Sequence, residues 1–191
     1  MFYVQHQDDE TIFGGGAVID AIKSVGSDNV YIVLVTDGSG SNVFNSERYK
    51  DITHQQKVDL RDNELLKDTV LYFENSFNNV THITHSYKYE THVQHIATGN
   101  TINNLYINGI IKDCRLLARE DKISGISRSN LIESVADDEE ERKKVLNACR
   151  EYELDNKDMV REGIGYKSVR GLFIKLTSNP KVPSYLHESG I

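Results

Sequence analysis

The residues best suited to chemistry lie close to the N-terminus, where positions 6–10 read His-Gln-Asp-Asp-Glu. A short apolar segment, residues 2–4, precedes them, and three glycines and an apolar-periodic segment follow at 14–22. This order predicts a strand, a polar loop and a helix, and ligands bind at the carboxyl ends of strands in open α/β sheets. Three carboxylates so close together repel one another unless a cation compensates them. The loop is therefore a candidate metal site, although an exposed acidic turn has the same pattern.

Histidines form the second feature, because five of the seven lie either in this loop or between positions 82 and 95. His6 and Asp9 are three residues apart, and His92 and His95 repeat that spacing. On a helical turn such pairs share a face, so either pair could point at one ion. Two imidazoles and one carboxylate with an open position are typical of catalytic zinc, whereas structural zinc sites are closed and cysteine-rich.

Apolar patterns predict the elements that position these residues. We expect helices over 13–25 and 50–73, and helical periodicity between residues 96 and 111. Strands are expected over 29–36, which reads as a buried parallel strand, and over 80–84, which His85 closes. Strands that alternate with helices predict an α/β fold with right-handed connections. Residues 161–178 are compatible with either a strand or a helix.

Smaller patterns have structural interpretations. Gly14–Gly16 are not a dinucleotide-binding loop, since the G-x-G-x-x-G pattern is absent, and we expect close packing of a helix start against the strand that precedes it. Cys114 and Cys149 fit no zinc-ligand spacing and are expected to be buried, reduced thiols. The acids at 137–141 suit the first turn of a helix.

Composition excludes several classes of protein. With 191 residues, 38% apolar and 27% charged, the chain suits one folded domain over residues 1–191. A net charge of −7 argues against a general nucleic-acid binder. We expect no transmembrane segment and no signal peptide, hence a cytoplasmic protein. Oligomeric state is not predicted.

Four patterns together resemble the LmbE-like, or PIG-L, family of N-acetylglucosaminyl deacetylases. They are the His-x-Asp-Asp-Glu after the first strand, the Val-Thr-Asp-Gly ending the second at 35–38, an Arg-x-x-Glu at Arg61 and Glu64, and the late His-x-x-His. The first motif departs from the family's usual His-Pro-Asp-Asp-Glu, since Gln7 replaces the proline. The resemblance covers residues 1 to about 100, and the C-terminal half is divergent.

The resemblance implies a Rossmann-like three-layer sandwich with a mostly parallel sheet and an active site at the carboxyl ends of its strands. It implies a metal-dependent N-deacetylase, a hydrolase that removes the acetyl group from a small N-acetylglucosamine-type conjugate. His6, Asp9 and His95 are the expected ligands of Zn²⁺, with another divalent metal such as Fe²⁺ as an alternative. Asp8 is the expected general base, His92 stabilises the oxyanion or acts as the acid, and Arg61 lies near the substrate.

Two other functions remain open. The same two-His-one-carboxylate set serves non-haem iron oxygenases, although their usual setting is an all-β barrel. A non-catalytic sugar-binding relative is also compatible with Gln7 and the divergent C-terminal half. Retention of Asp8, which binding alone does not need, argues against it.

Overall fold

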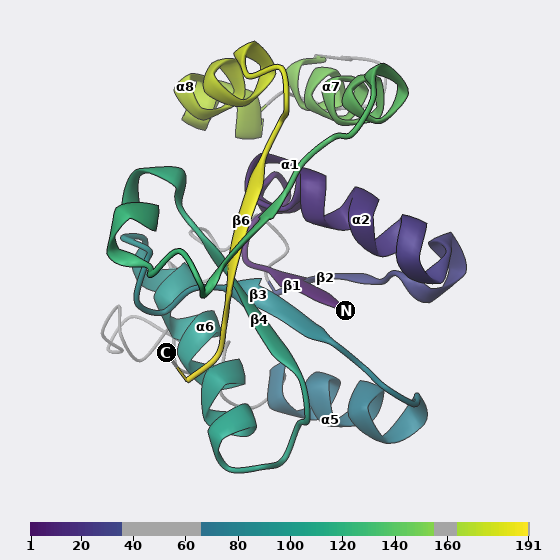
Figure 1. Ribbon diagram of the computed structural model, residues 1–191, viewed down its shortest axis with the longest axis vertical. Coiled ribbons are helices and arrows are strands. Elements are labelled where there is room, and N and C mark those ends of the chain that lie inside the picture. The colour runs from purple at the N-terminus through teal and green to yellow at the C-terminus, as the bar shows by residue number, and fades with distance from the viewer. Residues whose placement is uncertain (36–65, 155–163, 191) are drawn as a thin grey trace, which may run out of the picture. The chain divides into compact units, whose positions relative to one another are not determined.

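The computed structural model describes residues 1–35, 66–154 and 164–190 (Figure 1). The chain divides into two compact units, and each is described by itself. The first contains Met1–Gln7, Tyr31–Leu131 and Leu186–Ile191, and the second contains Asp8–Val30 and Ile132–Tyr185. Two compact units can belong to one domain, so the single domain over residues 1–191 stays a prediction.

Six strands form one sheet in the order β2-β1-β3-β4-β6-β5. β1 is parallel to both β2 and β3, and β3 is parallel to β4. Strands and helices together confirm the predicted α/β class. The strands are β1 (Phe2–Val4), β2 (Ile32–Leu34), β3 (His82–His85), β4 (Cys114–Ala118), β5 (Leu131–Ser134) and β6 (Ser184–Glu188).

Two helices build the core of the first unit, α5 (Leu66–Ser76) and α6 (Val93–Ile107), while the short helix η4 (Glu120–Gly125) follows β4. Side chains of α5 and α6 pack against residues of β1 and β4, and all three residues of β1 are buried. Burial raises the pKa of the Cys114 thiol to about 12, and this cysteine is free. The buried cluster comprises Tyr3, Leu66, Val70, Ile102, Leu105, Ile111, Cys114 and Leu116.

His82 and Thr84 in β3 are buried, and hydrogen bonds compensate both side chains. His82 is fully buried, with Nδ1 at 3.0 Å from the Tyr3 hydroxyl and Nε2 at 3.0 Å from a carboxylate oxygen of Glu74. The hydroxyl of Thr84 donates to the carbonyl oxygen of Tyr3 at 3.1 Å. A buried polar group costs free energy unless it is hydrogen-bonded. These bonds therefore offset the cost of burying His82 and Thr84 in the sheet.

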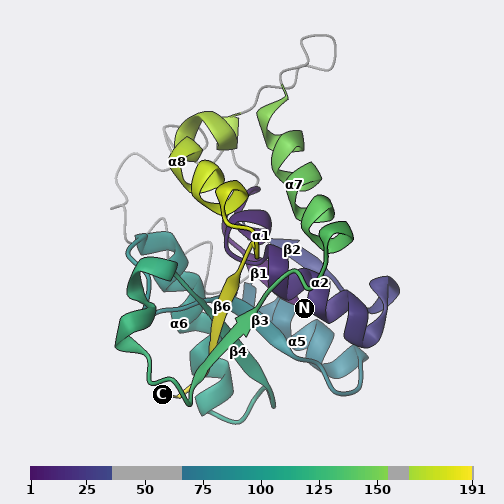
Figure 2. The same ribbon diagram turned by 45° about the horizontal axis from the view of Figure 1, so that its top comes forward.

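Helices make up most of the described part of the second unit. Its helices are α1 (Asp9–Ile12), α2 (Gly15–Val25), η1 (Ser27–Asn29), α7 (Glu139–Glu153) and α8 (Ile164–Ser178). Figure 2 shows α7 and α8 side by side, and Phe173 of α8 packs in a buried cluster with Val145 and Cys149 of α7. Cys149 is likewise a buried free cysteine, as expected.

The glycine-rich start of α2 is closely packed, as predicted. A Cβ atom on Gly16 would lie 2.6 Å from the carbonyl oxygen of Ser134 in β5, a distance that real Cβ atoms do not reach. The Gly16 N–H also donates to the hydroxyl of Ser184 at 3.0 Å. The packing partner is therefore β5 rather than the strand that precedes the helix.

The acidic run at 137–141 begins a helix, as predicted. Asp138 caps α7 by accepting the N–H of Glu141 at 2.9 Å, and the Glu141 carboxylate accepts the N–H of Asp137 at 2.7 Å. This reciprocal pair resembles a capping box. Three acids in the first turn also suit the helix dipole.

Most predicted elements are present with shifted ends. The predicted helix 13–25 is α2, and residues 164–178 form a helix rather than a strand. The strand expected over 29–36 is β2, but its predicted burial is wrong, because β2 is an edge strand with Ile32 and Leu34 exposed. The predicted helix 50–73 falls largely outside the described residues, which begin again at Leu66. Among the described helices, none combines the length and hydropathy that crossing a membrane would require.

We predict that the first unit loses stability in acid through His82. Burial lowers the pKa of His82 despite its bond to Glu74, so the native state binds fewer protons than the unfolded chain. The stabilisation is then complete above the unfolded value of about 6.5 and is lost as the pH falls below it. Burial lowers the pKa of His187 in the same direction.

Urea unfolding at pH 7.5 and 5.5, with a chelator present, measures this effect. Wild type should be less stable at the lower pH, and His82→Gln should show a smaller difference between the two pH values. An identical pH dependence in both proteins would assign the acid sensitivity to other groups.

Candidate metal centre

Imidazoles gather in the first unit where two neighbouring strands end. His6 lies two residues beyond β1, and His85 is the last residue of β3. These strands are parallel neighbours, so their carboxyl ends lie at one edge of the sheet. The next element, α6, packs against β3 and carries His92 at its N-cap position and His95 in its first turn.

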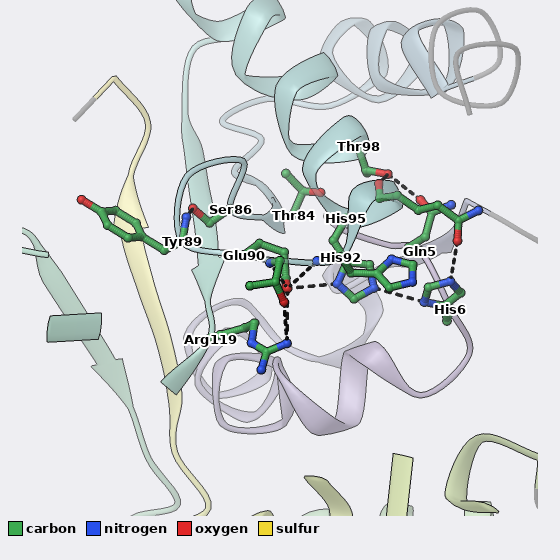
Figure 3. A network of polar contacts seen from close by, with 12 residues as sticks. Gln5, His6, Thr84, Ser86, Tyr89, Glu90, His92, His95, Thr98 and Arg119 are labelled. Carbon is green, nitrogen blue, oxygen red and sulfur yellow. Dashed lines mark hydrogen bonds and ion pairs between the residues drawn. The ribbon is translucent and has the colours of Figure 1, made fainter. Parts of the chain in front are cut away.

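Three of these histidines could hold one metal ion. One ring nitrogen from each of His6, His92 and His95 lies within 4.8 Å of the other two. The ring centroids are 5.0 Å apart for His6 and His92, 5.1 Å for His6 and His95, and 4.6 Å for His92 and His95. Figure 3 shows the His6 and His95 rings side by side, and Nδ1 of His6 is 3.1 Å from Nε2 of His95.

The partners on the far side of each ring set its tautomer. Nδ1 of His95 lies 3.1 Å from a carboxylate oxygen of Glu90, which can only accept when ionised, so Nδ1 carries the proton. Nε2 of His6 lies 3.0 Å from the amide oxygen of Gln94, so Nε2 carries the proton there. In the neutral rings, the two nitrogens that face each other at 3.1 Å are therefore both lone pairs. That arrangement is repulsive unless a cation, either a proton or a metal ion, lies between them.

The separation of the two facing nitrogens fits coordination of a common ion. Imidazole nitrogens bind zinc at about 2.0–2.1 Å, and tetrahedral geometry then separates two of them by about 3.3–3.4 Å. The observed 3.1 Å is close to that value. An outer partner that accepts the other ring N–H is also typical of metal-binding histidines. The donor set thus fits a metal ion with nitrogen ligands.

Glu90 makes several polar contacts around these rings. Its side chain is 1% exposed, and one carboxylate oxygen accepts the backbone N–H groups of Thr91 at 2.6 Å and His92 at 3.2 Å. The Arg119 guanidinium lies 3.7 Å away. Burial alone would raise the pKa of Glu90, but the hydrogen bonds from His95 and the two amides lower it overall. Glu90 is consequently an ionised buried carboxylate.

Close packing between α6 and the end of β3 fixes the position of His95. A Cβ atom on Gly99 would lie 2.4 Å from the carbonyl oxygen of His85, so no larger residue fits without moving the backbone. The buried ring of His85 stacks on His95, with centroids 3.9 Å apart and planes at 12°. The helix can therefore approach the strand closely enough for the two rings to stack.

A second polar cluster holds the loop between β3 and Glu90. The hydroxyl oxygen of Ser86 accepts the N–H groups of Lys88 at 3.2 Å and Tyr89 at 2.9 Å, and Nε2 of His187 lies 2.8 Å from it. A Ser-His pair resembles part of a nucleophilic triad, but both side chains are fully buried. The hydroxyl is used in shaping the loop, as is the Tyr89 hydroxyl, which donates to the carbonyl oxygen of Gly125 at 3.0 Å.

Three of the predicted site residues meet within the first unit. His6 and His95, expected as ligands, face each other, and His92, expected at the oxyanion, lies within the ligand-capable group. Asp8 and Asp9 begin α1 in the second unit, as its N-cap and its first residue. Their roles stay predictions. Arg61 lies outside the described residues.

Sequence reasoning missed Glu90 and Ser86 and gave His187 no role. Glu90 lies two residues before the His-x-x-His pair, a spacing that carries no recognised ligand signal. Its importance becomes visible only through its burial and its four polar contacts. Ser86 and His187 are 101 positions apart in the chain, so only the fold shows that they meet.

Comparison with protein-family models, curated proteins and solved structures finds no match to this chain. The family resemblance therefore depends on the motifs themselves.

We predict that the metal-free protein binds one Zn²⁺ per chain and that His6 and His95 are both required. Removing a ligand should weaken binding by more than the roughly 10–100-fold that loss of an outer hydrogen-bond partner costs. Isothermal titration of wild type, His6→Ala and His95→Ala measures the affinities.

His82→Gln is the control, because His82 lies at the other end of β3 and outside the ligand-capable groups. It should bind zinc as wild type does. Full affinity in His95→Ala would remove His95 from the site.

Proposed function

We propose that this chain is a zinc-dependent hydrolase that removes an N-acetyl group from an N-acetylglucosamine-type conjugate, as the resemblance to PIG-L deacetylases implies. The proposal includes the finer fold assignment of a Rossmann-like three-layer sandwich with a mostly parallel sheet. It also includes a cytoplasmic location and a small acetylated amino sugar, rather than nucleic acid, as the partner.

One observation carries the proposal, namely the 3.1 Å separation of Nδ1 of His6 and Nε2 of His95, whose other ring nitrogens face the acceptors Gln94 and Glu90. A purely structural histidine cluster would gain by turning one N–H toward the other ring. Here the carboxylate of Glu90 and the amide of Gln94 hold both N–H groups on the outside. An arrangement of imidazoles that favours a cation supports metal-assisted hydrolysis.

When bound, a zinc ion supplies Lewis acidity and lowers the pKa of a coordinated water to about 7. Asp9 is the proposed carboxylate ligand beside His6 and His95. Asp8, its neighbour, accepts the proton of the attacking water and returns it to the leaving amine. His92, which is exposed and lies beside the other two rings, donates a hydrogen bond to the acetyl oxygen as negative charge develops there. Arg61 is proposed to contact the substrate.

Zinc is the proposed metal because imidazole-rich sites with an open position suit it, although imidazole also suits iron. Elemental analysis of protein purified without added metal and kept free of oxygen distinguishes the two. Iron together with oxygen uptake in the presence of an oxoacid would replace the hydrolase by an oxygenase.

We predict that substitutions of the neighbouring residues Asp8 and Asp9 differ in their effect on bound zinc. Asp8→Asn keeps the size of the side chain but removes the base, so zinc should stay bound while turnover falls by roughly 10²–10⁴-fold. Asp9→Asn replaces an anionic ligand by a neutral one, so zinc affinity and turnover should both fall. Zinc titration and an assay for released amine measure the two quantities.

Two outcomes would change the assignment. If Asp8→Asn loses zinc and Asp9→Asn keeps it, the two roles are exchanged. If Asp8→Asn remains fully active, this loop is not the catalytic centre, and the deacetylase proposal fails with it.

We predict that a panel of N-acetylglucosamine conjugates releases primary amine when the zinc-loaded protein is added. An acyl-peptide panel and an ester panel serve as controls for hydrolysis that is not specific to sugars. Activity restricted to the peptides or esters would retain the hydrolase and overturn the sugar assignment.

A further inference from the structure

We propose that Glu90 is the positioning residue of the metal centre, and that it sets both the proton position on His95 and the placement of His92. This inference rests on the proposed metal-dependent function. Glu90 is not itself a proposed ligand, but it orients the histidines so that they can bind a cation.

The Glu90 carboxylate contacts both the His95 ring and the backbone of His92. Oε2 lies 3.1 Å from Nδ1 of His95, while Oε1 accepts the backbone N–H groups of Thr91 and His92. One side chain therefore connects the ring of one histidine to the backbone of the other. Both histidines of the His-x-x-His pair take their positions from the same carboxylate (Figure 3).

The Glu90 carboxylate also determines which ring nitrogen of His95 carries the proton. Because an ionised carboxylate can only accept, it holds the neutral His95 ring in the Nδ1–H tautomer and leaves Nε2 as a lone pair directed at His6. A carboxylate that accepts the other N–H also makes an imidazole a more basic ligand. Glu90 would thus act on a bound metal ion through His95.

Burial and the neighbouring Arg119 keep Glu90 in place. Its side chain is almost completely buried, and Arg119 lies beside it. The guanidinium of Arg119 is itself held by the carboxylate of Asp121 at 2.9 Å and by the hydroxyl of Thr91 at 2.9 Å. Since its donors already have partners, Arg119 supports the carboxylate rather than offering a site for a substrate anion.

A second histidine–carboxylate pair in the same unit provides a matched control. Glu74 lies 3.0 Å from Nε2 of His82 in a similarly buried setting. Among the described residues, neither belongs to a group that could hold a metal ion. Glu74→Gln therefore makes the same chemical change as Glu90→Gln, away from the candidate metal centre.

Glutamine cannot reproduce the contacts of Glu90, because one carboxylate oxygen becomes an NH₂ donor that faces either the two amides or the His95 ring. We expect Glu90→Gln to weaken Zn²⁺ binding by about 10–100-fold. Glu90→Asp, which keeps both oxygens, should recover part of the affinity, and Glu74→Gln should bind zinc as wild type does. Isothermal titration of Zn²⁺ into the metal-free proteins measures all four.

A second readout needs neither metal nor activity. Long-range ¹H–¹⁵N spectra of the metal-free protein report which ring nitrogen carries the proton. Wild type and Glu74→Gln should show His95 as the Nδ1–H tautomer, whereas Glu90→Gln should show a population with the proton on Nε2. Circular dichroism verifies that each variant is folded, and Glu90→Asp carries the test if Glu90→Gln is not.

The outcomes separate the two proposals. Unchanged zinc affinity in folded Glu90→Gln, or an Nε2–H tautomer for His95 in wild type, would overturn the role of Glu90. If wild type binds no zinc but shows the expected tautomers, Glu90 positions His95 as inferred, and it is the metal-dependent function that fails.

Discussion

The arrangement of the candidate metal centre depends on where two protons are held. His6 and His95 direct lone pairs at each other because Gln94 and Glu90 accept the N–H groups on the opposite sides of the rings. An imidazole pair left to itself would form one N–H···N hydrogen bond. The surrounding acceptors prevent this in the neutral rings, so a cation between the two nitrogens would be favourable there.

The scaffold makes this arrangement possible through close packing and satisfied polar groups. Parallel pairing of β1 and β3 brings His6 to the edge of the sheet where α6 begins. Gly99 then allows α6 to approach the backbone of His85, which lets the rings of His85 and His95 stack at 3.9 Å. Any side chain at Gly99 would displace the helix and with it the ring that faces His6.

The sequence predicted the α/β class from local periodicity. The association of His6 with the late His-x-x-His pair was implied by the family resemblance, since spacing alone relates only nearby positions. The sequence did not predict Glu90, since a carboxylate that acts through a histidine has no spacing of its own. It gave His187 no role, because the bond to Ser86 joins positions 101 residues apart. Asp8, Asp9 and the substrate contact at Arg61 depend on the resemblance, which the structure of the described residues leaves untested.

The two histidine–glutamate pairs of the first unit show why one is structural and the other is a candidate site. Glu74 accepts the Nε2–H of His82, and the other nitrogen faces the Tyr3 hydroxyl, which can donate a proton to it. That network is complete with protein groups alone, so burial simply keeps His82 neutral. Glu90 accepts the Nδ1–H of His95 in the same way, but the other nitrogen faces a second lone pair. The same pair of side chains therefore directs the second nitrogen at a hydroxyl in one case and at another imidazole in the other.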